Sequence, residues 1–407
     1  MAIEGSLIFT SFTFLDPSTV APVFIDTYTG SLQLAALAGT LRFFFSFLPQ
    51  LLIGPYTSRI KNITRYLSLI MLSLRPIPLL MIPILYSKLG PYTTVWIFLL
   101  VYAAFWVAEG LVIVPWLDLF SRTIPGEKRG KLLGYQQFFG GIGGLAAGVL
   151  IKITLDSPQL TNAAKYSIIF AAGGLLAFVS STVILPIRDF PRTPSSEPVN
   201  LIRYFRKLPS YFGKNDQFAT VNIIQVIAGI TSAIVPLVIL FSKNTFNLST
   251  PQVSTLVYIQ IGGMLVGGVL WGSVSHKLGN KYAVMLSQFI GLSLHVLALI
   301  CMALGASSAL PVLWVIALLN GIYMNSWLGF INYIIDVVDE KNRPEFLVLN
   351  GLVSFLLSSL YYLSGLAASA FGFAPLFVAG LAASICTIIL SFRLKSPKQL
   401  LSFGIHQ

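Results

Sequence analysis

Charged residues are scarce in this chain of 407 residues, at 10% of the total, whereas soluble globular domains have roughly a quarter. A water-soluble fold of this length needs a polar surface that so few charges cannot cover. Hydrophobic residues make up 56% of the chain, and its mean hydropathy is +0.82. A bilayer tolerates apolar side chains on every outward helix face, so the composition predicts an integral membrane protein.

Cysteine and histidine are also rare, with two and three residues respectively. Cys301 and Cys386 both fall in apolar segments, where a thiol usually behaves as a small hydrophobic group. The sequence therefore predicts no disulfide, no metal site and no redox centre. It has no convincing phosphate-binding loop or nucleophile arrangement, so we expect a protein that is not an enzyme and uses no cofactor.

Long apolar runs divide the chain into segments, because about 20 apolar residues cross the hydrocarbon core as a helix. Runs of this length predict twelve transmembrane helices, at 4–25, 31–56, 64–86, 92–119, 131–152, 164–187, 217–242, 253–275, 280–303, 311–336, 346–369 and 374–393. The expected fold class is therefore all-α membrane protein.

The longest polar interval, 188–216, is rich in proline, serine and basic residues and predicts a cytoplasmic linker. We expect an amino-terminal six-helix bundle over 1–187, a carboxy-terminal bundle over 217–393 and a cytoplasmic tail over 394–407. Within the linker, LIRYFRKL allows two interpretations: a short amphipathic helix on the anionic inner leaflet, or a solvated loop.

Lysine and arginine lie mainly on one side of the predicted membrane. Of the 26 basic residues, 20 fall in loops on one face and 4 in loops on the other. Cytoplasmic loops retain an excess of Lys and Arg, so we expect cytoplasmic termini in a plasma or inner membrane. The net charge of +12 is dispersed over short loops, which gives no reason to expect nucleic-acid binding.

Two stretches share a pattern of glycine followed by basic residues, GPYTSRIKNI at 54–63 and GSVSHKLGNK at 272–281. Their first glycines lie 218 positions apart, and so do Arg59 and Lys277. This offset equals six predicted helices and the linker, as an internal duplication would leave.

The second stretch resembles the signature loop of the major facilitator superfamily: glycine, an acidic or polar residue, a basic residue, a second glycine and further basic residues. Gly272, Lys277, Gly279 and Lys281 take the matching places, and His276 stands where the family often has aspartate. The first stretch is degenerate and lacks the second glycine. With the twelve predicted helices and the central loop, the resemblance covers nearly the whole chain. It implies a secondary transporter made of two pseudo-symmetric six-helix bundles.

The links after the fourth and tenth predicted helices resemble the family's cytoplasmic links. Arg129 lies in SRTIPGEKRGKLLG, Arg343 lies in KNRPEF, and Asp118 and Asp336 precede these links. Charges at paired helix ends can hold two bundles together, so we expect a cytoplasmic gate. Its candidate residues are Arg59, Asp118, Arg129, Lys277, Asp336 and Arg343.

Ionisable residues near the middle of a span mark transport pathways or buried ion pairs, because unpaired charge is costly there. Asp16, Arg42, Arg75 and Glu109 are expected at such positions in the first bundle. They are our candidates for proton coupling or substrate binding. Fixed ion pairing is the alternative, and for Arg75 we expect it, since the third helix of this fold is usually peripheral.

Polar and aromatic residues at helical spacing are candidates for lining a substrate cavity. They are Trp106, Trp116, Asn222, Gln225, Asn325 and Asn332. On the tenth predicted helix, Asn325, Asn332 and Asp336 are expected on one face. Packing is the alternative for the two tryptophans, which flank Glu109 on the fourth predicted helix. His295 is a lone imidazole in the ninth predicted helix, where we expect a packing role.

Glycines recur every fourth residue on two predicted helices, as Gly140 and Gly144 on the fifth and Gly263 and Gly267 on the eighth. Such faces let helix backbones approach each other. In the superfamily these helices pack between the bundles, so the resemblance implies a hinge surface there. A static contact is the alternative.

The residues and the resemblance together predict a secondary active transporter that works by alternating access. We expect proton-coupled export of a small amphipathic organic solute. Uptake of an organic anion, with Arg42 as the counter-charge, is one alternative. A lipid flippase or a non-transporting receptor on the same fold is another. The expected partners are the solute, protons and the lipid bilayer, and we expect a monomer.

Overall fold

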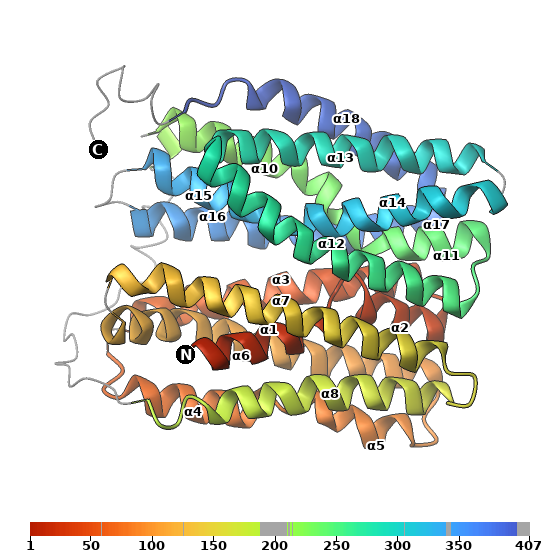
Figure 1. The fold of residues 1–407 in the computed structure, drawn as a ribbon, viewed down its shortest axis with the longest axis horizontal. Coiled ribbons are helices and arrows are strands. Elements are labelled where there is room, and N and C mark those ends of the chain that lie inside the picture. Colours follow the sequence, from red (N-terminus) through yellow and green to blue (C-terminus); the bar gives the residue numbers. More distant parts are fainter. Residues whose placement is uncertain are drawn as a thin grey trace. The chain divides into compact units, whose positions relative to one another are not determined.

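The computed structural model describes residues 1–57, 59–124, 126–187, 210, 212–213, 215–304, 306–338 and 343–396. Over these residues the regular structure is helical and contains no strand (Figure 1). Eleven helical segments within them are long and apolar enough to cross a membrane. The predicted linker lies almost entirely outside the described residues, as do its segment LIRYFRKL and the chain beyond residue 396.

The contacts divide the chain into two compact units, of which the first comprises residues 1–199 and 250–258. Its helices are α1 (Ala2–Thr13), α2 (Val20–Thr29), α3 (Leu32–Thr57), α4 (Ile63–Leu74), η1 (Ile77–Leu80), α5 (Met81–Leu85), α6 (Pro91–Thr123), α7 (Gly126–Asp156) and α8 (Asn162–Thr182). Figure 1 shows α1 beside α7 and α8, and both contacts are extensive.

The second unit comprises residues 200–249 and 259–407. Its helices are α10 (Asp216–Ile234), η3 (Val235–Leu237), α11 (Val238–Phe246), most of α12 (Thr250–Lys277), α13 (Asn280–Ala303), α14 (Ala306–Met324), α15 (Trp327–Val337), α16 (Arg343–Leu357), α17 (Ser359–Phe371) and α18 (Phe373–Ser391). The limits predicted for the two bundles stay a prediction, because the expected linker is largely outside the described residues.

The first span is broken, so the prediction of one helix over 4–25 is wrong. Helix α1 ends at Thr13 and α2 begins at Val20, and Pro17 lies between them. Proline has no amide hydrogen and disfavours a continuous helix. Asp16 therefore lies in the break and not in the middle of a helix.

Four other predicted spans change geometry along their length. In the third, α4 ends before Arg75 and Pro76, so Arg75 caps α4 and lies near the middle of the apolar span Ile63–Leu85, as predicted. In the seventh, Pro236 lies in the short 3-10 turn η3 between α10 and α11. The tenth breaks at Asn325 between α14 and α15, without a proline, and the eleventh breaks at Ser358. Irregular backbone in a membrane needs polar partners, so these breaks indicate where polar side chains are required.

Gly140 on α7 and Gly267 on α12 pack closely within their own units. A Cβ atom added at Gly140 would lie 2.8 Å from Cβ of Phe9 on α1. One added at Gly267 would lie 2.8 Å from the carbonyl oxygen of Ile322 on α14. The absence of a side chain at these two positions lets α7 pack closely on α1 and α12 pack closely on α14. The hinge surface expected between the bundles stays a prediction.

The contact between α12 and α14 gives a matched pair of glycine substitutions. A Cβ at Gly321 would overlap the carbonyl oxygen of Gln260, whereas nothing lies within 4 Å of one at Gly268. Alanine favours a helix over glycine by about 0.8–1 kcal/mol, so Gly268→Ala should be neutral or stabilising. Gly321→Ala should destabilise by about 1–3 kcal/mol, because overpacking forces the helices apart. Melting temperatures of the two purified variants test this, and equal values would contradict the close contact.

Candidate functional site

A buried cluster of three charged side chains lies inside the first unit. Nε of Arg75 is 2.7 Å from Oε1 of Glu109, and its Nη2 donates to Oε2 at 3.2 Å. Nη1 of the same arginine is 2.8 Å from Oε1 of Glu4. The side chains of Arg75 and Glu4 are each 2% exposed and that of Glu109 is 12% exposed. Two carboxylates therefore share one guanidinium in a site without bulk water.

Helix ends bring this cluster together. Arg75 follows the last residue of α4, Glu4 lies in the first turn of α1, and Glu109 lies within α6. Nε1 of Trp116 donates to Oε2 of Glu4 at 2.9 Å. Oγ of Ser180 on α8 accepts from Nη1 of Arg75 at 3.1 Å and donates to the backbone oxygen of Glu4 at 3.0 Å. The charged groups are thus fixed by hydrogen bonds from four helices.

The arginine and Glu109 were both candidates from the sequence, and the structure brings them together. Glu4 was not, although it is the second acid of the cluster. An acidic residue near the start of the first apolar run was the available signal. Trp116, a cavity-lining candidate, holds Glu4 and stacks on Phe120 with ring centroids 5.1 Å apart.

A second charged group surrounds the break between α1 and α2. Oδ1 of Asp16 accepts from the backbone N of Ser18 at 2.9 Å and from the Thr19 hydroxyl at 3.1 Å. Its other oxygen, Oδ2, is 3.8 Å from Nη1 of Arg42 on α3. That separation is too long for a hydrogen bond, so the two charges attract each other without a fixed contact. The arginine side chain is 26% exposed and that of Asp16 is 6% exposed.

Aromatic rings surround the guanidinium of Arg42. Its Cζ lies 4.7 Å from the ring centroid of Trp106 and 5.4 Å from that of Phe43. Trp106 also packs against Phe12, with centroids 5.2 Å apart. Cations over tryptophan faces are attracted electrostatically, which favours this position of the arginine. The group offers one cation, one acid and an aromatic wall, and it is more accessible than the Arg75 cluster.

Amide side chains form a network in the second unit. Nδ2 of Asn350 on α16 donates to Oε1 of Gln225 at 2.5 Å and to Oδ1 of Asn222 at 3.2 Å. Nε2 of Gln225 donates to the hydroxyl of Ser354 at 2.9 Å. The two α10 residues were cavity-lining candidates, whereas Asn350 was missed. Their polar groups now hold α10 against α16.

The break in the tenth span separates residues that were expected on one helix face. Nδ2 of Asn325, at the break, donates to the carbonyl oxygen of Met264 at 2.6 Å. Asp336 on α15 accepts from Nδ2 of Asn280 at 2.7 Å. Asn332 lies half-buried on the same helix as Asp336. The predicted common face is therefore interrupted between Asn325 and the other two residues.

The predicted gate residues have local contacts. Asp118 pairs with Arg122 one turn later at 3.1 Å, and the Arg59 guanidinium lies 5.9 Å from the Tyr56 ring centroid. Lys277 is exposed at the last residue of α12. The side chains of Arg129 and Arg343 lie outside the described residues. The gate as a whole stays a prediction.

In the part of the chain that the structure describes, no three His, Cys, Asp or Glu side chains are grouped to hold a metal ion. The chemistry available in the charged groups is proton exchange at buried carboxylates and ionic or aromatic contact with a solute. Neither needs a cofactor.

Comparisons with known proteins bear on the fold. The family model described as Major Facilitator Superfamily matches residues 221–403. A crystal structure of a D-xylose-proton symporter is similar, with a TM-score of 0.72, 14% identity and coverage of 98% of this chain and 97% of that one. The nucleoside transporter NupG gives a TM-score of 0.69 at 13% identity, with 97% of both chains covered.

A further similar structure is that of a bacterial homologue of the human lysosomal transporter Spinster. Its TM-score is 0.59 at 15% identity, with 99% of this chain and 96% of that chain covered. No curated protein sequence matches the chain significantly. The family match covers the second half of the chain, and the likeness over nearly the whole chain shows the fold of these transporter structures, with two six-helix bundles.

Proposed function

We propose that this transporter exports a small amphipathic organic solute by alternating access and couples this transport to protons. The observation that carries the proposal is the sharing of Arg75 by two buried carboxylates, Glu4 and Glu109. The three side chains carry a net charge of −1 when both acids are ionised. One proton would neutralise the group, so the cluster is suited to take up and release a single proton.

Glu109 is the carboxylate that we propose to exchange the proton. Its side chain is 12% exposed, compared with 2% for Glu4. Glu4 also accepts a hydrogen bond from the indole of Trp116 through its second oxygen, so both of its oxygens are engaged. Protonation of Glu109 would weaken its pairing with Arg75 while leaving Glu4 to hold the cation. A change of partners among Glu4 on α1, Arg75 at the end of α4 and Glu109 within α6 is the step that we propose to drive rearrangement.

The group formed by Asp16, Arg42 and Trp106 is our proposed solute contact. Its partly exposed arginine, an acid that makes no hydrogen bond to that arginine, and its aromatic ring provide both charged and apolar contacts. An amphipathic cation would displace the arginine from Asp16 and stack on the indole. The alternative, an organic anion that is taken up, would instead bind Arg42. One of the similar structures is named a proton symporter, which is compatible with proton coupling in either direction.

A thermal-shift screen of the purified protein distinguishes these substrate classes. Lipophilic cations, organic anions and lysolipids are each tested for a rise in melting temperature. A ligand at 100 times its Kd should stabilise the protein by about 2.7 kcal/mol. We expect lipophilic cations to stabilise it, and we expect Asp16→Asn and Trp106→Ala to reduce that shift.

Comparison of Arg42→Gln with Asp16→Asn distinguishes a cationic solute from an anionic one at this group. With a cationic solute, the shift should persist or grow in Arg42→Gln, because a competing cation is removed. With an anionic solute, the shift should be lost in Arg42→Gln and retained in Asp16→Asn. Stabilisation by lysolipids alone would favour the alternative function of a lipid flippase.

A transport assay distinguishes an active carrier from a non-transporting receptor, because only the carrier moves solute in dependence on a proton gradient.

We also propose that both termini and the interval 188–216 are cytoplasmic, in the plasma or inner membrane of the cell. The 20-to-4 distribution of basic residues supports this orientation. In a background without Cys301 and Cys386, a cysteine within 188–216 should react with an impermeant maleimide only from the cytoplasmic side. Ser157→Cys should react only from outside. Labelling of both positions from one face would contradict the twelve-span topology.

A further inference from the structure

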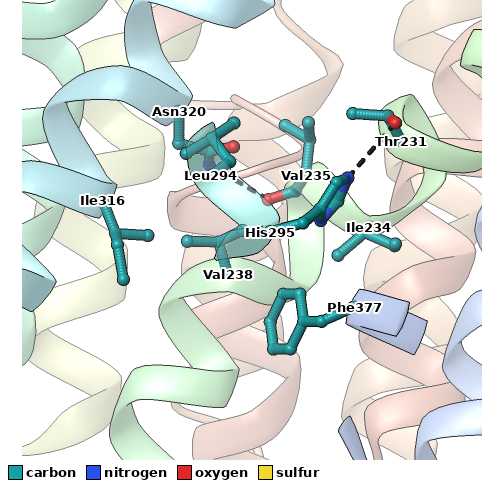
Figure 2. Close-up of a pocket in the computed structure, with 9 residues that line it drawn as sticks. All are labelled: Thr231, Ile234, Val235, Val238, Leu294, His295, Ile316, Asn320 and Phe377. Atoms are coloured by element: carbon teal, nitrogen blue, oxygen red, sulfur yellow. Dashed lines mark hydrogen bonds between the residues drawn. The ribbon is translucent and has the colours of Figure 1, made fainter. Parts of the chain in front are cut away.

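A small cavity lies inside the second unit, away from the amide network of Asn222 and Asn350. Nine residues from α10, η3, α11, α13, α14 and α18 line it (Figure 2). Six of them are aliphatic or aromatic, and the three polar ones are Thr231, His295 and Asn320. The enclosed space is about large enough for one water molecule and far too small for an organic solute.

Two buried polar atoms of this lining have no hydrogen-bond partner among the described residues. They are Nδ1 of His295 and Oδ1 of Asn320, on side chains of residues that are 2% and 0% exposed. The remaining polar atoms of these side chains are engaged. Nε2 of His295 lies 3.2 Å from the hydroxyl of Thr231, and Nδ2 of Asn320 donates to the carbonyl oxygen of Val235 at 3.2 Å (Figure 2). Buried polar groups are almost always satisfied by protein or by ordered water.

The unpartnered atoms require the same kind of ligand. Oδ1 of Asn320 can only accept a hydrogen bond. When Nε2 of a neutral His295 donates to Thr231, Nδ1 of the ring is also an acceptor. The imidazole packs directly against Gly380 on α18, because a Cβ there would overlap its Cε1 and Nε2 atoms. A ligand with two donors and the size of a water molecule therefore matches both atoms.

We infer that this cavity is a binding site for a single water molecule, which donates one hydrogen bond to Nδ1 of His295 and the other to Oδ1 of Asn320. The site connects α13 with α14. Through Asn320 it also reaches η3 and α12, since Nδ2 donates to Gln260 at 3.1 Å as well as to Val235.

The site lies where the seventh span is irregular. Pro236 follows Val235 and cannot donate an amide hydrogen to the preceding turn, so this backbone depends on other polar groups. Broken helices persist in membranes where side chains and ordered water satisfy them. The bound water completes the hydrogen bonding of Asn320, which in turn supports the carbonyl of Val235. The water therefore helps to stabilise the irregular backbone between α10 and α11.

Nitrogen NMR of histidine tests the site in the full-length protein. The chain has three histidines, so the double variant His276→Gln, His406→Gln leaves His295 as the only imidazole. With 15N-labelled histidine in lipid bilayers, we expect an unprotonated, hydrogen-bonded Nδ1 and magnetisation transfer from water to the ring. A spectrum with Nδ1 protonated, or one without transfer from water, would overturn the assignment.

Variants of the lining provide the matched comparison. Asn320→Leu removes the second acceptor, and the water signal at His295 should be lost. Ile316→Val changes only the apolar wall, so the signal should be retained. If Asn320→Leu does not fold, Val238→Ile fills the cavity without altering a polar atom and should also abolish the signal. Magnetisation transfer from water that persists in Asn320→Leu or in Val238→Ile would contradict a single bound water.

Discussion

Arg75→Leu is expected to destabilise the folded protein by about 3–5 kcal/mol, the usual cost of breaking a buried ion pair by removal of one partner. The substitution leaves Glu4 and Glu109 buried together without the guanidinium that both contact. It also removes a donor to Ser180. We therefore expect a large loss of folded protein in membranes and a strongly lowered melting temperature in detergent.

Removing the two acids as well should rescue much of this loss. The triple variant Arg75→Leu, Glu4→Gln, Glu109→Gln has no charge left in the cluster, so the cost of two uncompensated buried charges is removed. Each single acid substitution in the Arg75→Leu background should give a partial rescue. Melting temperatures of the five proteins, including the parent, measure the coupling directly.

Lys152→Leu is the matched control for the arginine. Lys152 pairs with Asp156 one turn later on α7, but the two side chains are 34% and 25% exposed. Exposed pairs of this kind contribute about 0–1 kcal/mol, so this variant should stay close to the parent. Equal destabilisation by Lys152→Leu and Arg75→Leu would contradict the special role of the buried cluster. So would a triple variant that is no more stable than Arg75→Leu alone.

The positions of the spans could be predicted from the sequence because hydropathy and span length determine them. The run predicted over 280–303 coincides with α13, Asn280–Ala303. Breaks within spans were harder to predict, since a proline signals only some of them. Pro17 and Pro236 lie at breaks, but the break at Asn325 has no such residue. There the asparagine side chain supplies a hydrogen bond to α12, and that contact depends on tertiary packing.

The charged residues of the site could be predicted one by one, but their partners could not. Ionisable residues in apolar runs are visible in the sequence, and Arg75 and Glu109 were found in this way. Their pairing joins residues 34 apart, and the contact of Arg75 with Glu4 joins residues 71 apart. Asn350 meets Gln225 across 125 residues. Such pairs follow from helix packing, for which one sequence carries no local signal.

Glu109→Gln is expected to abolish accumulation of the solute driven by a pH gradient while leaving exchange of the solute intact. Glutamine imitates the protonated acid, so the cluster keeps its neutral form through the whole cycle. Coupling of one proton per solute molecule would let a gradient of one pH unit support about tenfold accumulation in the parent protein. The variant should approach no accumulation in proteoliposomes, measured with the solute that gives the largest thermal shift.

Glu4→Gln and Asp16→Asn test whether one of the other two buried acids carries the coupled proton instead of Glu109. Glu4 is held by Trp116 and by Arg75 and is almost fully buried, so its neutral variant should lower the melting temperature but retain coupling. Asp16→Asn should weaken solute binding and leave the pH dependence of the remaining transport unchanged. If Glu109→Gln still drives uphill transport with the pH dependence of the parent, Glu109 does not carry the coupled proton. Loss of coupling in Asp16→Asn alone would assign that role to the acid at the break between α1 and α2, where Arg42 is its only cation at 3.8 Å among the described residues.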